Sequence, residues 1–227
     1  ARLMIMTVLA VLWGTRMTLN FARRGGYQWP PWRGDEDYRW EYVRAMLRAD
    51  RYPVVWQLFN ATFICFYQLT LLMLLTLPGI YVLSHHDVKL NEWDWVLTAT
   101  FLALLTLESV ADGQQFAFFA EKYRRRDAGE PLTGDYKAGF LRSGLFSICR
   151  HPNYAAEQGM WIVMYMFALN VASQRADEPI FVHWTGLGAL LLVLLFYPSS
   201  LLSESITASK YADYAAYQRS HCRFFPF

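Results

Sequence analysis

Five apolar stretches, each long enough to cross a lipid bilayer, constrain the fold of this chain more than any other feature. They lie near residues 3–21, 54–77, 93–107, 154–171 and 184–202, and a spanning helix needs roughly 20 mostly apolar residues. Apolar residues make up 55% of the chain and charged residues only 18%, whereas a soluble domain carries about 25% charge. The expected fold class is therefore all-α: a polytopic membrane helical bundle of about five transmembrane helices, forming a single domain over residues 1–227.

The loops between these stretches alternate in basic charge. Residues 22–53 and 113–151 hold seven Lys and Arg each and the tail after Leu202 holds three, whereas the other two loops hold one each. Because cytoplasmic loops carry the excess of Lys and Arg, the N-terminus is expected on the other side and the C-terminus on the basic side. An integral protein of the endoplasmic reticulum and one of an organellar inner membrane fit this pattern equally.

Other function classes are disfavoured by the composition. The net charge of +2 is small and no nucleic-acid motif is present, so no nucleic acid is expected as a partner. Cys65, Cys149 and Cys222 are odd in number and far apart, which fits neither a disulfide framework nor a zinc set. They are interpreted as three ordinary thiols, and no metal site is predicted.

Polar side chains gather at the basic ends of the predicted spans. Glu108 and Asp112 lie four residues apart and so share a helix face, and Asn153 and Glu157 repeat this spacing. Glu204 closes the fifth stretch; Arg16 and Asn20 close the first. Ionisable groups at membrane depth cost about 2.5–3.5 kcal/mol and persist where they face a protein interior or a wet cavity. The pattern predicts a polar pocket open to the basic side.

The residue types narrow what this pocket would bind. Carboxylates and amides suit ribose hydroxyls and amide-bearing rings, and arginines suit phosphate, so a nucleotide-like cofactor fits, although other polar ligands fit as well. A structural alternative is that Pro152 begins a helix that His151 or Ser147 caps, with Glu157 favoured by the helix dipole. Capping leaves the acidic residues at the same level of the other spans unexplained.

Four motifs carry a resemblance to a known family. The segment "GLFSICRHPNYAAE" at residues 144–157 resembles the signature of steroid 5-alpha-reductase-like membrane proteins, in particular a branch catalogued as a domain of unknown function. Three further stretches match that branch in chain order: residues 13–40, residues 108–118 ("ESVADGQQFAF") and the Tyr-rich tail at 211–227. The resemblance therefore covers nearly the whole chain.

The resemblance implies a steroid-reductase-like membrane enzyme that binds NADPH from the cytoplasmic side. Such an enzyme reduces a carbon–carbon double bond conjugated to a carbonyl in a sterol-like or other lipid substrate. Asn153, Glu157 and Asp112 match cofactor-contacting positions, Arg16 corresponds to a cofactor-side arginine, and the others fall within matching motifs. The cofactor-binding residues implied in this way are Asn153, Glu157, Asp112, Arg150, His151, Tyr154, Arg16, Glu108 and Glu204.

The chain also departs from that family. The helix carrying a Gln-Glu pair that polarises the substrate carbonyl would precede Ala1, and residues 1–26 contain no tyrosine to match the one on the next helix. Seven spans are expected in the family and five here. Either further helices precede Ala1 in the full-length protein or the catalytic helix pair is lost, and catalytic residues stay unassigned.

Two alternatives to a reductase therefore remain open. One is a non-catalytic, reductase-fold structural subunit of a larger membrane complex. The other is a membrane methyltransferase using S-adenosylmethionine, because such enzymes share "RHPxY" and a Tyr-rich tail. They typically carry a Glu-Glu pair where this chain has Ser203-Glu204, so the reductase-like branch fits better.

Overall fold

The computed structural model describes residues 1–30, 36–175 and 183–224, and the regular elements over these residues are all helices. The chain forms two compact units. Unit 1 comprises Ala1–Leu97 and Met164–Leu192, and unit 2 comprises Thr98–Val163 and Val193–Phe227. The three long helices α6, α8 and α9 each begin in one unit and end in the other. The all-α expectation is confirmed for the described residues.

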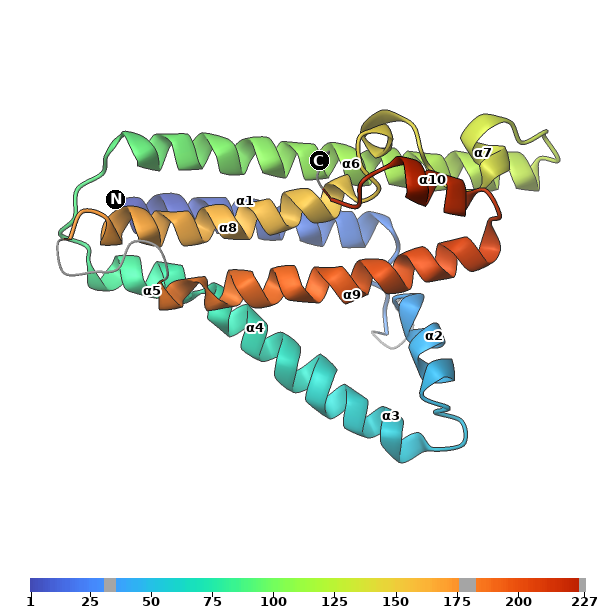
Figure 1. The fold of residues 1–227 in the computed structure, drawn as a ribbon, viewed down its shortest axis with the longest axis horizontal. Coiled ribbons are helices and arrows are strands. Elements are labelled where there is room, and N and C mark those ends of the chain that lie inside the picture. The colour runs from blue at the N-terminus through green and yellow to red at the C-terminus, as the bar shows by residue number, and fades with distance from the viewer. Residues whose placement is uncertain (31–35, 176–182, 225–227) are drawn as a thin grey trace. The chain divides into compact units, whose positions relative to one another are not determined.

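Unit 1 contains the first two apolar stretches as long helices. Its elements are α1 (Arg2–Arg23), α2 (Arg39–Met46), α3 (Pro53–Phe59), the π-helical η2 (Asn60–Tyr67), α4 (Gln68–Leu75) and α5 (Leu77–Ser84). Pro53 and Pro78 each occupy the first turn of a helix, where a missing N–H costs nothing. The chain changes direction between α4 and α5 (Figure 1), so Pro78 bends the second stretch rather than ending it.

The remaining long helices are α6 (Glu92–Asp127), α8 (Pro152–Ala172) and α9 (Leu187–Lys210), the last preceded by the 3-10 turn η4 (Trp184–Gly186). With 36 residues, α6 is about 54 Å long at 1.5 Å per residue. That length exceeds the roughly 30 Å hydrocarbon core of a bilayer. One end of α6, which carries Arg124, Arg125 and Arg126, therefore extends into the aqueous layer.

Four helical segments in the described part of the chain are long and apolar enough to cross a membrane: Arg2–Arg23, Pro53–Ser84, Glu92–Asp127 and Trp184–Lys210. The fourth stretch, near residues 154–171, does form a helix, α8. It is not among the four, so the expectation of five spans is confirmed for four only. Glu157, Gln158 and Asn170 are buried polar residues on α8, and Met160 and Phe167 on the same helix are fully covered by protein.

The outer surfaces of the membrane segments in unit 1 are apolar. Met4, Val8 and Val11 on α1, and Leu69 and Leu72 on α4, are all at least half exposed. Exposed aliphatic side chains at this density are unfavourable in water but suit acyl chains. With the four apolar helices, these surfaces identify a membrane protein.

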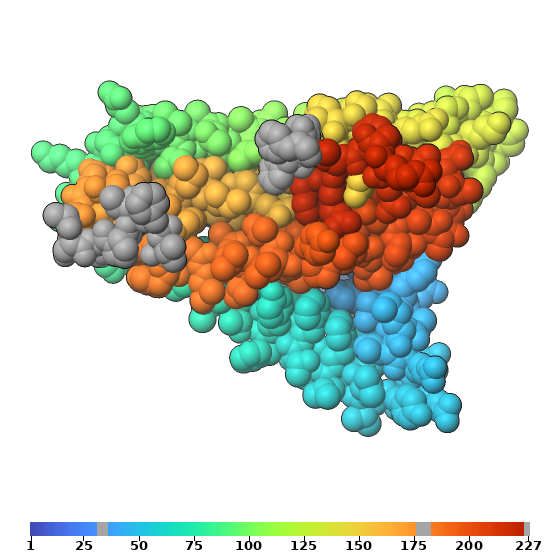
Figure 2. Space-filling view, viewed as in Figure 1, coloured from blue at the N-terminus to red at the C-terminus, as the bar shows by residue number. Residues whose placement is uncertain are grey.

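Unit 2 packs its C-terminal segment through aromatic rings. Phe140, which follows the short helix α7 (Gly134–Ala138), forms a buried cluster with Tyr214 and Tyr217 of α10 (Tyr214–Ser220). Lys122 of α6 supports this contact, since its Nζ donates to Gly139 O at 2.8 Å. Figure 2 shows the C-terminal segment, in red, directly against the yellow segment that contains α7 and the loop after it.

Candidate functional site

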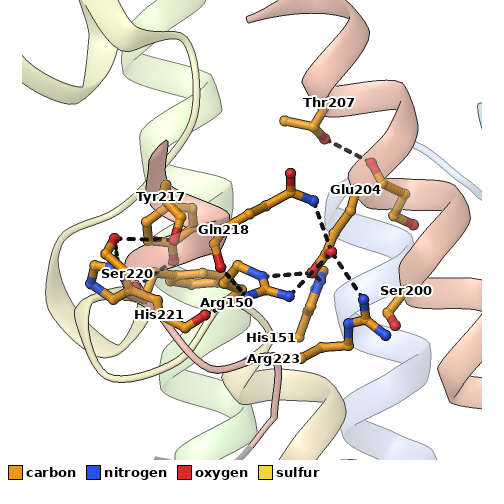
Figure 3. A network of polar contacts seen from close by, with 12 residues as sticks. Arg150, His151, Ser200, Glu204, Thr207, Tyr217, Gln218, Ser220, His221 and Arg223 are labelled. Carbon is orange, nitrogen blue, oxygen red and sulfur yellow. Dashed lines mark hydrogen bonds and ion pairs between the residues drawn. The ribbon is translucent and has the colours of Figure 1, made fainter. Parts of the chain in front are cut away.

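The most connected polar group in unit 2 is the Glu204 carboxylate on α9, whose side chain is 2% exposed. Arg150 donates from Nε to Glu204 Oε1 at 2.7 Å, and His151 Nε2 lies 2.9 Å from the same oxygen. The other oxygen, Oε2, accepts from Gln218 Nε2 at 3.0 Å and from Arg223 Nη2 at 3.4 Å (Figure 3). These five residues, the Glu204 cluster, join the start of α8, the unit 2 part of α9 and the tail.

The backbone around the Glu204 cluster explains why these segments meet. Arg150 Nη1 donates to the carbonyls of Gln218, at 2.9 Å, and His221. The Arg150 and His151 backbone N–H groups donate to Cys222 O and Arg223 O at 2.9 and 3.0 Å. Buried carbonyls and N–H groups need such partners, so the segment entering α8 satisfies the backbone of the tail.

A second group of buried polar side chains lies between α6 and α8 in unit 2. Asn153 Nδ2 donates to Asp112 Oδ1 at 3.1 Å, which brings together two residues that the sequence analysis placed in one pocket. The two helices run in opposite directions (Figure 1), and Gly159 packs against the Leu104 side chain in the same register.

Glu108 lies one helical turn before Asp112 on α6, and Glu157 lies one turn after Asn153 on α8. Because the two helices are antiparallel, Glu108 and Glu157 lie at the same level. All three carboxyl side chains are buried, and Glu157 Oε1 accepts from Trp161 Nε1 at 2.9 Å. We call Glu108, Asp112, Asn153 and Glu157 the α6–α8 polar level. Three buried carboxylates beside one amide form an acceptor-rich site that attracts hydroxyl and amide donors.

The other predicted residues lie elsewhere. Tyr154 stacks on His151 with ring centroids 5.1 Å apart and contacts Phe196 edge-on at 4.8 Å, so it belongs with the Glu204 cluster. Arg16 lies on α1 in unit 1, where its Nη2 contacts Met17 Sδ at 2.7 Å. The nine candidates thus divide between two places in unit 2 and one in unit 1.

The capping alternative is only partly supported. Pro152 begins α8 as that interpretation expects. The Ser147 hydroxyl, however, donates to Gly144 O at 2.7 Å, and His151 is directed at Glu204. The Arg150 guanidinium is directed at Glu204 and the tail backbone, and its predicted contact with a phosphate stays a prediction.

An open cavity of about 730 Å³ lies in unit 2 beside the projecting half of α6. Its polar lining includes Gln114, Glu121, Arg125, Asp135 and Ser143. Gln114 is two residues beyond Asp112, so the cavity adjoins the α6–α8 polar level along the chain. The pKa of Asp135 lies below its usual value. Burial alone would raise this pKa, but hydrogen bonds from Ser143 and Arg142 outweigh that effect.

One buried polar cluster in unit 1 was missed by sequence reasoning. Arg2 Nε and Nη2 donate to the two oxygens of Asp94 at 2.6 and 2.8 Å, and both side chains are almost fully buried. Asn170 Nδ2 donates to Asp94 Oδ1 at 3.0 Å, while Asn91 and Asn170 exchange amide hydrogen bonds at 2.9 Å. A signal for this cluster was present in the sequence. Arg2 and Asp94 lie at the starts of the first and third predicted spans, which are expected to begin on the same side of the membrane.

Comparison with known proteins places the chain within a family. A family model described as "Protein of unknown function (DUF1295)" matches residues 1–221. The uncharacterized protein C594.04c of Schizosaccharomyces pombe is 37% identical over 232 residues, covering 99% of this chain and 63% of the relative. The chain thus spans less than two thirds of that relative's length. No solved structure matches the chain.

Proposed function

The chain belongs to the DUF1295 family, whose description assigns no function. We propose the function that its resemblance to steroid 5-alpha-reductases implies: NADPH-dependent reduction of a conjugated carbon–carbon double bond in a sterol-like or other lipid. The observation that carries the proposal is the α6–α8 polar level. Three buried carboxyl groups at one depth between two helices present hydrogen-bond acceptors, which suit a ligand that carries many donors.

The residues fit the donor groups of a nicotinamide nucleotide. Carboxylates of Asp112 and Glu157 accept hydrogen bonds from ribose hydroxyls or from the nicotinamide amide, and the Asn153 amide both donates and accepts. The open cavity beyond Gln114, with Arg125 in its wall, offers space for the polar remainder of the nucleotide. When bound, the cofactor supplies a hydride to the β-carbon of the conjugated system.

The chain's own contribution is to bind the cofactor and the lipid substrate, to orient them, and to exclude water from the site. Apolar helix surfaces around the polar level admit a lipid substrate from the bilayer and keep bulk water away from the reacting carbons. A proton must also reach the α-carbon, and no residue is assigned as its donor. The expected partners are accordingly membrane lipids and a lipidic substrate.

The proposal is tested by titrating NADPH into the detergent-solubilised protein and measuring saturable binding. We expect the parent to bind, and Asn153→Ala and Glu157→Ala to lose binding while retaining the parent's helical content. Gln174→Ala, an exposed amide just past the other end of α8, is the matched control and keeps binding. Absence of saturable NADPH binding by the parent refutes the proposal, and saturable S-adenosylmethionine instead favours the methyltransferase alternative.

A second candidate is a non-catalytic subunit of a larger membrane complex. It is favoured by the Glu204 cluster, in which Arg150, His151 and Glu204 satisfy one another and hold the tail rather than line an open site. Extraction from the native membrane in mild detergent distinguishes the two. A large stable assembly without bound nucleotide supports the subunit, whereas a small particle that retains NADPH supports the enzyme.

A further inference from the structure

Two of the three cysteines lie side by side in unit 2, although they are far apart in the sequence. Cys149 and Cys222 pair in an isolated parallel β-bridge. The Arg150 N–H donates to Cys222 O at 2.9 Å, and the His151 N–H donates to Arg223 O at 3.0 Å. The sequence analysis interpreted the three cysteines as ordinary thiols, and all three are free cysteines in the structure; the new observation is that Cys149 and Cys222 are neighbours.

The geometry of a parallel bridge suits a disulfide. Backbones paired in this way lie about 4.7–4.9 Å apart, within the 4.4–6.8 Å that usually separates the Cα atoms of disulfide-bonded cysteines. Directly paired residues also direct their side chains to the same face. Cys149 and Cys222 therefore need little backbone movement to join.

The two thiols differ in accessibility. Cys149 is 4% exposed and Cys222 is half-buried. Burial raises the pKa of the Cys149 thiol, and the nearby Cys222 contributes in the same direction. Because the thiolate is the reacting form and must be reached, Cys222 is the better initial nucleophile and Cys149 the better resolving thiol.

We propose that Cys149 and Cys222 form a redox-sensitive pair that a hydroperoxide oxidises to an intramolecular disulfide. The Cys222 thiolate attacks the O–O bond, which breaks to give a sulfenic acid and releases the alcohol, or water from hydrogen peroxide. The Cys149 thiol then attacks the sulfenic sulfur, and water leaves as the S–S bond forms. Two thiols and one hydroperoxide yield one disulfide, one alcohol and one water, and two electrons pass from sulfur to the peroxide oxygen.

The position of the pair gives the disulfide a structural consequence. Cys149 precedes Arg150 and His151, and Cys222 precedes Arg223, so each cysteine adjoins members of the Glu204 cluster. A covalent bond there would lock the tail to the start of α8. On the side that the basic loops predict to be cytoplasmic, disulfides are usually transient and redox-sensing, so this bond would reversibly add a covalent link to the hydrogen bonds that already hold the tail.

The experiment uses the whole chain in detergent micelles with the substitution Cys65→Ser. This substitution removes the third cysteine of the chain, which is exposed and lies in unit 1. Protein is treated with tert-butyl hydroperoxide, denatured, labelled with a maleimide and measured by intact mass and peptide mapping. We expect loss of both labelling sites, one cross-linked peptide pair containing Cys149 and Cys222, and full recovery with dithiothreitol. Limited proteolysis of the oxidised protein should release the tail at least several-fold more slowly than in the reduced protein.

Two variants in the same background make the result specific. Cys222→Ser should retain one labelled thiol and form no cross-link, and Cys149→Ser should behave likewise. The proposal is overturned if both cysteines stay reduced at a peroxide dose that oxidises Cys65 in the parent. It is equally overturned if oxidation stops at sulfinic acid on one cysteine or joins two chains. None of these outcomes depends on NADPH binding, so this proposal and the proposed function fail separately.

Discussion

Replacing Glu204 with alanine tests whether the Glu204 cluster is a structural anchor or a cofactor contact. The substitution removes the acceptor for Arg150, His151 and Gln218 and leaves the Arg150 guanidinium, 9% exposed, without its carboxylate. Removing one partner of a buried ion pair typically costs about 3–5 kcal/mol. For a chain of this length about 2–4 °C is lost per kcal/mol, so the apparent unfolding temperature should fall by roughly 6–20 °C.

The assay is tryptophan-fluorescence melting in detergent micelles, combined with limited proteolysis of the tail, which should become cleavable after Tyr217. Glu204→Gln retains an acceptor but no charge, so we expect an intermediate loss. The matched control is Glu36→Gln, which breaks a solvent-exposed pair with Arg44 and should leave the melting temperature close to the parent's, as exposed pairs contribute little. If Glu204→Ala melts like the parent but loses NADPH binding, the structural reasoning is refuted and the residue is a cofactor contact.

Three further predictions test other parts of the molecule. Asp94→Ala should lower stability by about 3–5 kcal/mol in the same melting assay, because it leaves a buried arginine unpaired, and an unchanged melting temperature would contradict the importance of that cluster. Gly188→Ala should destabilise by about 1–3 kcal/mol, since its new Cβ would lie 2.5 Å from the Leu74 backbone. Gly113→Ala, whose new Cβ would meet nothing within 4 Å outside the backbone of its own helix, should instead stabilise slightly, and equal effects of the two substitutions would count against the close approach of Gly188 to Leu74. The folded-state pKa of Asp135 is lowered, so its stabilisation is complete above its unfolded-state pKa and is lost as the pH falls through the folded-state pKa; the stability gap between the parent and Asp135→Asn should shrink on acidification below about pH 4, and a constant gap in pH-dependent melting would refute this.

Much of the candidate site was predictable because it follows helical spacing. The i, i+4 pairs Glu108–Asp112 and Asn153–Glu157 each define one helix face, and the structure brings these two faces together through the Asn153–Asp112 hydrogen bond. The fourth predicted span was only half predictable: the length of α8 is a local property, but whether α8 faces lipid depends on which helices surround it.

What the sequence by itself determined is the membrane character and the helices, because the length and apolarity of a segment decide both without reference to the rest of the chain. The tertiary structure alone decided which polar side chains meet. The pairs Arg150–Glu204, Arg2–Asp94 and Cys149–Cys222 join residues far apart in the chain, and no local periodicity encodes such contacts. Their partners are set by how the helices and the tail pack, since each buried charge or carbonyl must find its complement within the fold.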